Sequence, residues 1–338
     1  MSYINYVCVS SYYYMDIKNT STKITSSLSI FTNKLIDYAG LFPPASLGIY
    51  NSYSNFLRYY DSPYGFMLSR FIIPSKKLPE LADIYSHFDV TKQAPLSVLF
   101  TGGDTAKQFI DELKNDIKLV NEFITKHEER VILESFETKL PADLFSDLKG
   151  IKEFFVAISS FVEKELKSTV NIFFEAPPDI NMPTLIDALT EFNKEHGRSY
   201  GYKLRTGGLE ASAFPDAGHI STVLKICRNH EVPVKFTAGL HHPLRRYEES
   251  VKTIMHGFLN IFTAGIINCT HDINRHEIQE ILLDDNIDNF EFHENYFQWK
   301  NLVVLNSSIS DARKRFLISF GSCSFEEPIE DLKELELL

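Results

Sequence analysis

The chain has 338 residues, a length that fits either one large barrel or two domains of ordinary size. Hydrophobic residues make up 44% and charged residues 23%, the composition of a globular protein with a sizeable core. The formal net charge of −11 argues against non-specific binding to nucleic acids or membrane surfaces, and no apolar run reaches the ~20 residues that a membrane-spanning helix needs.

The spacing of the cysteines and the first residues of the chain indicate the cellular compartment. The cysteines lie far apart, without Cys-x-x-Cys spacing, at Cys8, Cys227, Cys269 and Cys323. This pattern favours reduced thiols in a cytoplasmic protein over a disulfide framework. The first residues lack the basic region and long apolar core of a signal peptide. We expect residues 1–30 to form a poorly ordered extension and residues 31–338 to form a single domain.

From residue 31 onward, short apolar runs alternate with amphipathic stretches. Residues 34–41 read as a short helix ended by Gly40 and the prolines that follow, and residues 51–60 as a second helix rich in aromatic residues. The apolar runs, which predict strands, are 69–74, 96–101, 130–136, 170–176, 201–206 and 232–238. The intervals, which predict helices, are 76–87, 104–127, 141–165, 182–196 and 216–230.

This alternation of strands and helices predicts the fold class. Its spacing is typical of βαβ units and a parallel sheet. Six units in succession, without a linker, favour one α/β domain, a (β/α) barrel of the TIM type. After Val251 the pattern weakens: residues 251–268 read as a helix and residues 290–305 as a short hairpin. The sequence therefore leaves open an incomplete or distorted barrel.

Polar residues recur near the carboxyl ends of the predicted strands, where barrels of this type carry their active sites. They are Arg70, Thr101, Glu134, Glu175, Lys203, Arg205, Lys235 and Thr237. A parallel strand is buried on both faces, so an ionisable side chain within it is unfavourable unless it is paired or functional. For any one of these residues, a structural role in an ion pair of the barrel interior is as good an explanation as a role in a functional site. For all eight together, the structural role is the weaker explanation.

Lys235 is the strongest candidate for a catalytic residue. A lysine desolvated beside another cation has a lowered pKa, and its neutral amine can attack a carbonyl carbon to form a Schiff base. Lys203, at a similar depth on the preceding strand, is the second cation. The alternative is that both lysines hold a phosphate or a carboxylate as point charges.

An anionic ligand would find further partners around the two lysines. Arg205 offers a bidentate guanidinium, and the backbone amides of Gly207 and Gly208 can approach an oxyanion. We expect the substrate-binding residues to be Arg70, Glu134, Arg205, Gly207, Gly208, Thr237, His242 and Arg245.

Glu175 and His241 are the candidates for proton transfer. Glu134, Glu175 and His241 also suit a divalent metal, although established zinc spacings such as His-Glu-x-x-His are absent. Charge balance for the lysines and arginines is the simpler role for the two glutamates. We therefore expect no required cofactor and keep a divalent metal as an alternative.

Several sequence blocks resemble a bacterial family of (β/α)-barrel proteins of uncharacterised function. The blocks are LIDYAGLFPPASL (35–47), KLRTGG (203–208), KFTAGLHHPLR (235–245), HGFLNIF (256–262) and FGSCSFEEPIEDL (320–332). The resemblance covers the chain from about residue 31 to its end and leaves out the N-terminal extension. It implies a barrel and no particular activity.

Two further resemblances are local. The run VKFTAG (234–239) is similar to the Schiff-base lysine strand of deoxyribose-phosphate aldolase and other class I aldolases, which would make Lys235 the nucleophile. Phe236 and Ala238 stand where those aldolases have a more hydroxyl-rich run. The run GYKLRTGGL (201–209) is similar to a phosphate-handling strand of nicotinate phosphoribosyltransferases, which have an incomplete barrel. Arg205 stands where that family has a carboxylate.

The sequence thus predicts a cytoplasmic barrel enzyme that acts on a small anionic carbonyl metabolite, phosphorylated or carboxylated. The expected chemistry is lyase-like, as in aldolases, through a Schiff base or an enolate at Lys235. The alternatives are a phosphoribosyltransferase-like or metal-dependent barrel enzyme, and a metabolite-binding protein without turnover. The expected partner is a small anionic metabolite, with neither nucleic acid nor membrane involved, and a homo-oligomer is left open.

Overall fold

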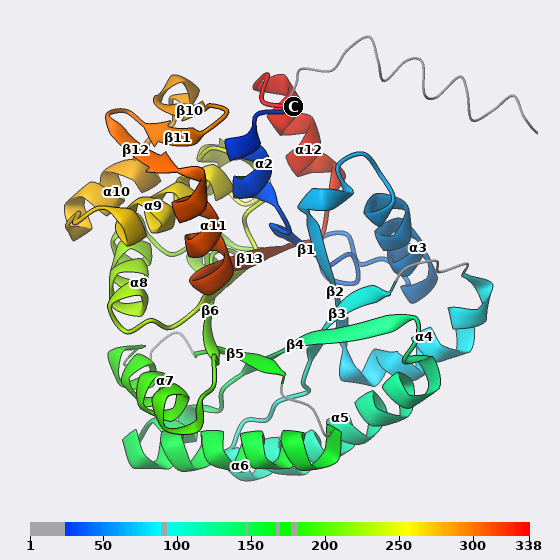
Figure 1. The fold of residues 1–338 in the computed structure, drawn as a ribbon. Helices are drawn as coiled ribbons and strands as arrows, with labels where there is room; N and C mark the ends of the chain where they lie inside the picture. The colour runs from blue at the N-terminus through cyan, green and yellow to red at the C-terminus, as the bar shows by residue number, and fades with distance from the viewer. Residues whose placement is uncertain (1–23, 89–92, 147, 167–169, 177–181) are drawn as a thin grey trace, which may run out of the picture.

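A closed barrel of eight parallel strands forms the centre of the molecule, with helices around it (Figure 1). The computed structural model describes residues 24–88, 93–146, 148–166, 170–176 and 182–338. The strand order around the barrel is β1-β13-β7-β6-β5-β4-β3-β2, and β1 pairs with β2 to close it. The predicted TIM-type α/β barrel is confirmed, and the barrel is closed rather than incomplete.

The six predicted strands are all present, with ends shifted by up to three residues. The barrel strands are β1 (Ile36–Tyr38), β2 (Leu68–Pro74), β3 (Ala94–Leu99), β4 (Val131–Lys139), β5 (Asn171–Glu175), β6 (Gly201–Arg205), β7 (Val234–Thr237) and β13 (Leu317–Ser322). The helices are α2 (Ser26–Thr32), α3 (Ile49–Tyr60), α4 (Leu78–Ile84), α5 (Ala106–His127), α6 (Leu148–Leu166), α7 (Met182–His196), α8 (Ala217–Asn229), α9 (Phe258–Thr270), α10 (Arg275–Leu283), α11 (Asn306–Arg315) and α12 (Glu326–Glu334).

Two barrel strands, β1 and β13, were not predicted from the sequence. The predicted helix over 34–41 is wrong, because residues 36–38 form β1 between β13 and β2. A strand of three residues is too short to show a period of two, and this one carries the fully buried Asp37. β13 mixes serine and glycine with its apolar residues, so it shows no apolar run.

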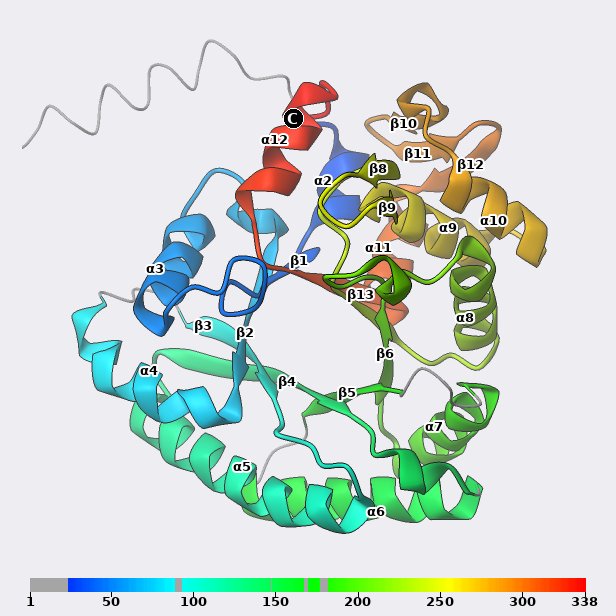
Figure 2. The same cartoon turned by 180° about the vertical axis from the view of Figure 1, so that it is seen from behind.

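Two small insertions extend the barrel beyond its repeating units. Residues 253–255, predicted as part of a helix, form β9 (Thr253–Met255), which pairs with β8 (Arg246–Glu248). Both follow the carboxyl end of β7, and Figure 2 shows the barrel from their side. The predicted hairpin over 290–305 is a three-stranded antiparallel sheet of β10 (Phe290–Phe292), β11 (Tyr296–Trp299) and β12 (Leu302–Leu305).

The beginning of the described chain is packed onto the insertion sheet. Of the predicted extension, residues 1–23 lie outside the described residues, whereas residues 26–30 belong to α2. The ring of Phe31 contacts Phe292 and Phe297, with centroids 5.4 and 5.5 Å away. No helix in the described part of the chain has the length and apolar character to cross a membrane.

One buried arginine joins the two ends of the barrel chain. The guanidinium of Arg313, at the end of α11, donates to the carbonyl oxygens of Phe31 and Asn33 at 3.0 Å each and of Ile318 at 2.9 Å. It also donates to the carbonyl oxygens of Lys34 and Leu317. Five backbone carbonyls are thereby satisfied by one side chain. Arg313 therefore ties the segment that leads into β1 to the neighbouring strand β13.

Candidate active site

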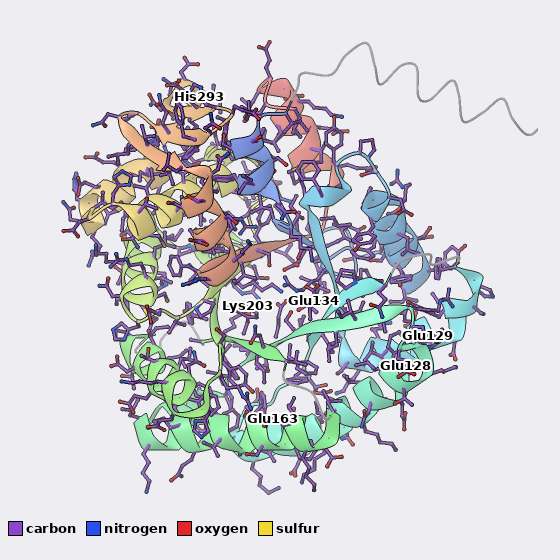
Figure 3. All side chains as sticks on the ribbon, viewed as in Figure 1. Glu128, Glu129, Glu134, Glu163, Lys203 and His293 are labelled. Carbon is purple, nitrogen blue, oxygen red and sulfur yellow. The ribbon has the colours of Figure 1, made fainter. Side chains whose placement is uncertain are left out.

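A chain of charged side chains of alternating sign runs through the barrel interior. Figure 3 shows two of its members, Glu134 and Lys203, near the middle of the barrel, whereas Glu128 and Glu129 lie at its outer side. In order of contact, the chain is Glu134, Arg70, Asp37, Lys235, Glu137, Lys203, Glu175 and Arg205. Four carboxylates face four cations, so the interior charge is balanced.

Lys235 lies at the centre of this chain. Its Nζ is 2.9 Å from Asp37 Oδ2 and 3.3 Å from Ser97 Oγ, and it also donates to Glu137 Oε1. The side chain is 1% exposed. Three acceptors match the three donors of an ammonium group. The amine of Lys235 is therefore held in one position by β1, β3 and β4.

Glu137 is shared by both lysines. Its Oε2 lies 2.9 Å from Nζ of Lys203, while its Oε1 accepts from Lys235 and, at 2.6 Å, from Ser97 Oγ. Burial alone would raise the pKa of Glu137, but the ammonium groups of Lys203 and Lys235 outweigh it and hold this pKa far below its ordinary value. Glu137 is therefore the ionised link between β6 and β7.

Two further members of this row of charged side chains, Asp37 and Lys203, have shifted pKa values. Burial would raise the pKa of Asp37, but Lys235 and Arg70 together lower it. Burial would lower the pKa of Lys203, but Glu137 and Glu175 outweigh that effect and raise it. Both shifts favour the charged form, so Lys203 is a fixed positive charge next to Lys235, its register partner on the adjacent strand.

The row of charged side chains reaches the carboxyl ends of the barrel strands at Glu175 and Arg205. Glu175 Oε2 lies 3.4 Å from Lys203 Nζ, and its Oε1 accepts from Arg205 Nε at 2.8 Å. The Arg205 side chain is 50% exposed and bonds only through Nε, so both terminal amino groups are without a partner among the described residues. Lys139 pairs with Glu175 in register and is exposed, with no carboxylate in ion-pair distance in the described part of the chain. Two cations, Lys139 and Arg205, thus flank Glu175 at the end of the barrel where the strands have their carboxyl ends, which we call the mouth.

Arg70 and Glu134 do not lie at this mouth, contrary to the sequence prediction. Arg70 is the third residue of β2 and Glu134 the fourth of β4, and their Nε and Oε2 atoms are 2.9 Å apart. Both line a cavity at the amino-terminal end of the barrel. For Glu134 the prediction was wrong because it ended the strand at residue 136, whereas β4 continues to Lys139. For Arg70 it was wrong because this residue stands near the beginning, not the end, of its strand. Glu137 and Lys139, which it left out, occupy the positions expected of Glu134.

The glycines and Thr237 lie where the loops after β6 and β7 meet. A Cβ on Gly207 would stand 2.7 Å from Gly239 Cα, so Gly207 permits the close approach of the two loops. Thr206 Oγ1 donates to the carbonyl oxygen of Ala238 at 2.5 Å. Gly208 packs against Ala213, and Thr237 ends β7, half-buried. In the structure, Gly207 permits contact between the two loops, and Gly208 contacts a residue of its own loop.

The other predicted residues are held by helices outside the barrel interior. His241 Nδ1 lies 3.0 Å from Glu327 Oε2, and His242 Nδ1 lies 2.6 Å from Asp331 Oδ2, both on α12. Arg245 donates to the carbonyl oxygen of Leu283, at the end of α10. Thr101 donates to Asp116 of α5. No hydrogen bond or ion pair in the described residues joins these side chains to the charged chain.

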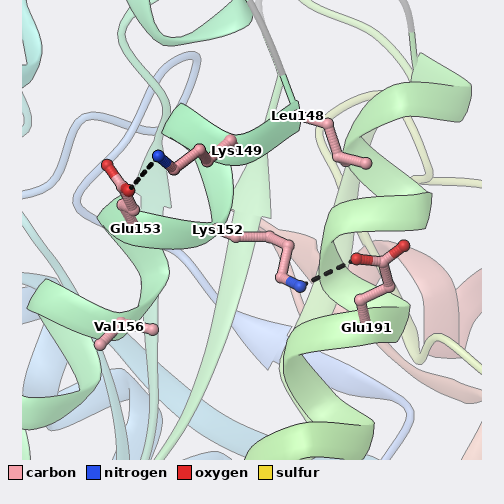
Figure 4. Close-up of a pocket in the computed structure, with 6 residues that line it drawn as sticks. All are labelled: Leu148, Lys149, Lys152, Glu153, Val156 and Glu191. Atoms are coloured by element: carbon pink, nitrogen blue, oxygen red, sulfur yellow. Dashed lines mark hydrogen bonds and ion pairs between the residues drawn. The ribbon is translucent and has the colours of Figure 1, made fainter.

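A metal site built from Glu134, Glu175 and His241 is not formed. Glu134 contacts Arg70, Glu175 contacts Lys203, and His241 contacts Glu327. Within the described ranges, no group of three or more His, Cys, Asp or Glu side chains is placed to hold a metal ion. A small groove of about 500 Å³ between α6 and α7 is also separate from the charged chain, and its Lys149 and Lys152 are paired with Glu153 and Glu191 (Figure 4).

We expect the unfolding free energy to fall in acid, in part because Glu137 is buried in its ionised form. Because the pKa of Glu137 is lower in the folded chain than its ordinary value of 4.5, its contribution to stability is complete above that pH and declines as the pH falls below it. We expect Glu137→Gln to reduce the unfolding free energy most at pH 6–7, and the difference from the native chain to shrink by up to about 1.4 kcal/mol per pH unit below about pH 4. Urea titrations at several pH values measure this. The exposed Glu153→Gln is the control, and a difference independent of pH would contradict the expectation.

Comparisons with known proteins add little to this geometry. No protein-family model matches the chain, and no curated protein matches it. A solved structure of similar fold is the tetrameric deoxyribose phosphate aldolase from Aeropyrum pernix, with 9% sequence identity and a TM-score of 0.46 over 92% of this chain and 93% of that chain. A likeness at this level carries no inference about activity, and the barrel itself rests on the strand pairing described above.

Proposed function

We propose that the protein is a lyase-type enzyme that forms a Schiff base between Lys235 and a small anionic carbonyl compound. The observation that carries the proposal is the meeting of two lysines, from neighbouring strands, on one buried carboxylate. Each lysine also contacts a second carboxylate, Asp37 for Lys235 and Glu175 for Lys203, so the two amines lie side by side while the interior charge stays balanced. Both amines lie two residues before the carboxyl ends of their strands, the end at which barrels of this type carry their chemistry, and a lysine there can act as a nucleophile.

In the proposed reaction, the ammonium of Lys235 first gives up a proton to water that enters with the substrate, because Asp37 and Glu137, the two carboxylates that contact it, are held in their ionised form. The neutral amine then adds to the substrate carbonyl carbon. The carbonyl oxygen takes up protons and leaves as water, and a protonated imine remains. Lys203 stays positively charged throughout, held by Glu137 and Glu175.

The protonated imine then acts as an electron sink. The bond between the α and β carbons of the imine breaks, and its electron pair forms an enamine. A carboxylate removes the proton of the hydroxyl on the β carbon, and that fragment leaves as a carbonyl compound. Glu175 suits this last step because it lies between Lys203 and the exposed Arg205. Protonation of the enamine and addition of water return the free amine and complete the balance of atoms.

Borohydride trapping tests this proposal. The native chain is incubated with small carbonyl compounds, including acetaldehyde, pyruvate and dihydroxyacetone phosphate, and reduced with sodium borohydride. We expect a stable mass increase on the peptide that carries Lys235, and none in Lys235→Arg. The exposed Lys118→Arg is the matched control. Turnover of a substrate without an adduct, or an adduct on Lys203 alone, would remove Lys235 as the nucleophile.

The cations at the mouth are expected to bind the charged group of the substrate. Replacement of Arg205 or Lys139 by methionine removes a hydrogen-bond donor with full charge, which is worth about 1.5–3 kcal/mol, or roughly 10–100-fold in affinity. We expect KM for the anionic substrate to rise by that factor, with unfolding free energies within about 1 kcal/mol of the native value because both side chains are exposed. Steady-state kinetics and urea titrations measure the two effects. An unchanged KM in both variants would place the anion elsewhere.

A binding protein without turnover is the second candidate. The observation that favours it is the complete pairing of the interior chain, which needs no substrate to balance its charges. In that case anionic metabolites would raise the melting temperature, while neither turnover nor a borohydride adduct would be found across the same panel.

A further inference from the structure

A second cavity, of about 1390 Å³, opens at the amino-terminal end of the barrel, opposite the mouth. Its walls include Ser69, Asn171 and Pro233, which begin or precede barrel strands, and the carboxyl end of α11. Figure 1 shows α11 next to β13. In barrels of this type the substrate site lies at the other end. A ligand here would therefore be different from the substrate.

Phe173 separates this cavity from the two lysines. Phe173 lines the cavity, and its ring centroid lies 5.6 Å from Nζ of Lys235. A Cβ on Gly201 would stand 2.5 Å from the same ring, so the ring occupies the space beside the start of β6. Neither Lys203 nor Lys235 is part of the cavity wall. The cavity therefore reaches the charged chain at Arg70 and Glu134, away from the proposed nucleophile.

The cavity wall is basic although the chain as a whole is acidic. Lysines and arginines outnumber aspartates and glutamates in it by six to three, against a net charge of −11 for the whole chain. Lys34 and Arg70 are paired with Glu134. Arg228, Lys314 and Arg315 are exposed, and the structure shows no carboxylate within ion-pair distance of them among the described residues. These three cations come from two different helices, and the one hydrogen bond that their side chains make in the described residues is a contact of 3.3 Å from Arg228 Nη1 to Asn229 Oδ1.

We propose that this cavity binds a small molecule with more than one phosphate or carboxylate charge. The exposed cations of α8 and α11 supply the charge, because guanidinium groups bind such oxyanions in a bidentate manner. The rings of Phe173 and Phe316 and the side chain of Ile318 offer apolar contact to the body of an organic anion. The proposal does not depend on the chemistry at Lys235.

Thermal denaturation with inorganic pyrophosphate tests the proposal. Relative to sodium chloride of equal ionic strength, we expect pyrophosphate at about ten times its Kd to raise the melting temperature of the native chain by about 1–3 °C. The same rise is expected in Arg205→Met, where the mouth is weakened. In the double variant Arg228→Met with Arg315→Met, it should be lost, and calorimetry should show a Kd raised at least tenfold.

A control with the same loss of charge makes the test specific. Lys107→Met with Lys118→Met removes two exposed cations from α5 and should keep the full pyrophosphate effect. The proposal is overturned if the native chain gives no rise, or if the Arg228 and Arg315 variant keeps it. A rise lost in Arg205→Met would assign pyrophosphate to the mouth and would equally overturn it.

Discussion

Replacement of Lys235 by methionine is expected to lower the unfolding free energy by about 3–5 kcal/mol, the effect of removing one partner from a buried ion pair. Asp37 and Glu137, both buried, would lose the cation between them, while the methionine keeps nearly the same volume. Urea titration at pH 7 measures the loss. The exposed Lys118→Met, whose Nζ lies 3.9 Å from Glu122 Oε1, should stay within about 0.5 kcal/mol of the native chain.

A double variant shows whether the loss arises from the unpaired charge. Glu137→Leu combined with Lys235→Met removes both charges of one link and leaves Lys203 with Glu175 and Asp37 with Arg70. We expect the double variant to be less destabilised than the sum of the two single variants by about 1–3 kcal/mol. Additive losses would mean that packing, and not charge pairing, explains the position of Lys235.

Replacement of Arg313 by methionine is expected to lower the unfolding free energy by about 3–5 kcal/mol. The five carbonyl oxygens that Arg313 satisfies would lose their donor, and each buried carbonyl left without one destabilises by about 1–3 kcal/mol before water enters. Arg313→Lys should recover a small part, because one ammonium cannot reproduce the guanidinium fork. Urea titration measures the losses, and hydrogen exchange should show weaker protection of β1 and β13.

The neighbouring lysine provides the control for this position. Lys314 follows Arg313 on α11 and is exposed, so Lys314→Met is expected within about 0.5 kcal/mol of the native chain. A loss below about 1 kcal/mol in Arg313→Met would show that water replaces the guanidinium without penalty. Arg313 would then have no special part in joining α2, β1 and β13.

The sequence predicted the middle of the barrel better than its closure. Strands β2 to β7 are recognisable because each carries an apolar run between amphipathic helices, and this pattern is local. The equal depth of Lys203 and Lys235 was also expected, and the register of β6 and β7 pairs the two residues. β1 was not predicted because three residues are too few to show a period, and β13 was not predicted because its serines and glycine interrupt the apolar run.

The same difference explains which site residues were missed. Asp37 stood in a segment predicted as helix, and Glu137 and Lys139 stood beyond the predicted end of their strand. One signal was present: Ser135, Glu137 and Lys139 alternate along β4 and so share one face. Polar residues at a period of two, continuing past an apolar run, would have extended the strand and added both residues to the candidates.

By itself, the sequence determined the α/β class, the strands β2 to β7 and the presence of two lysines at one depth. Each of these depends on spacing within a few dozen residues, which a single chain displays directly. Only the tertiary structure decided that Asp37, Glu137 and Lys235, about 100 residues apart from one to the next, contact one another, and that Arg70 and Glu134 lie at the opposite end from Arg205. The reason is physical: periodicity states which face of a strand a residue occupies, whereas its partners across a barrel depend on how the strands close and in which register.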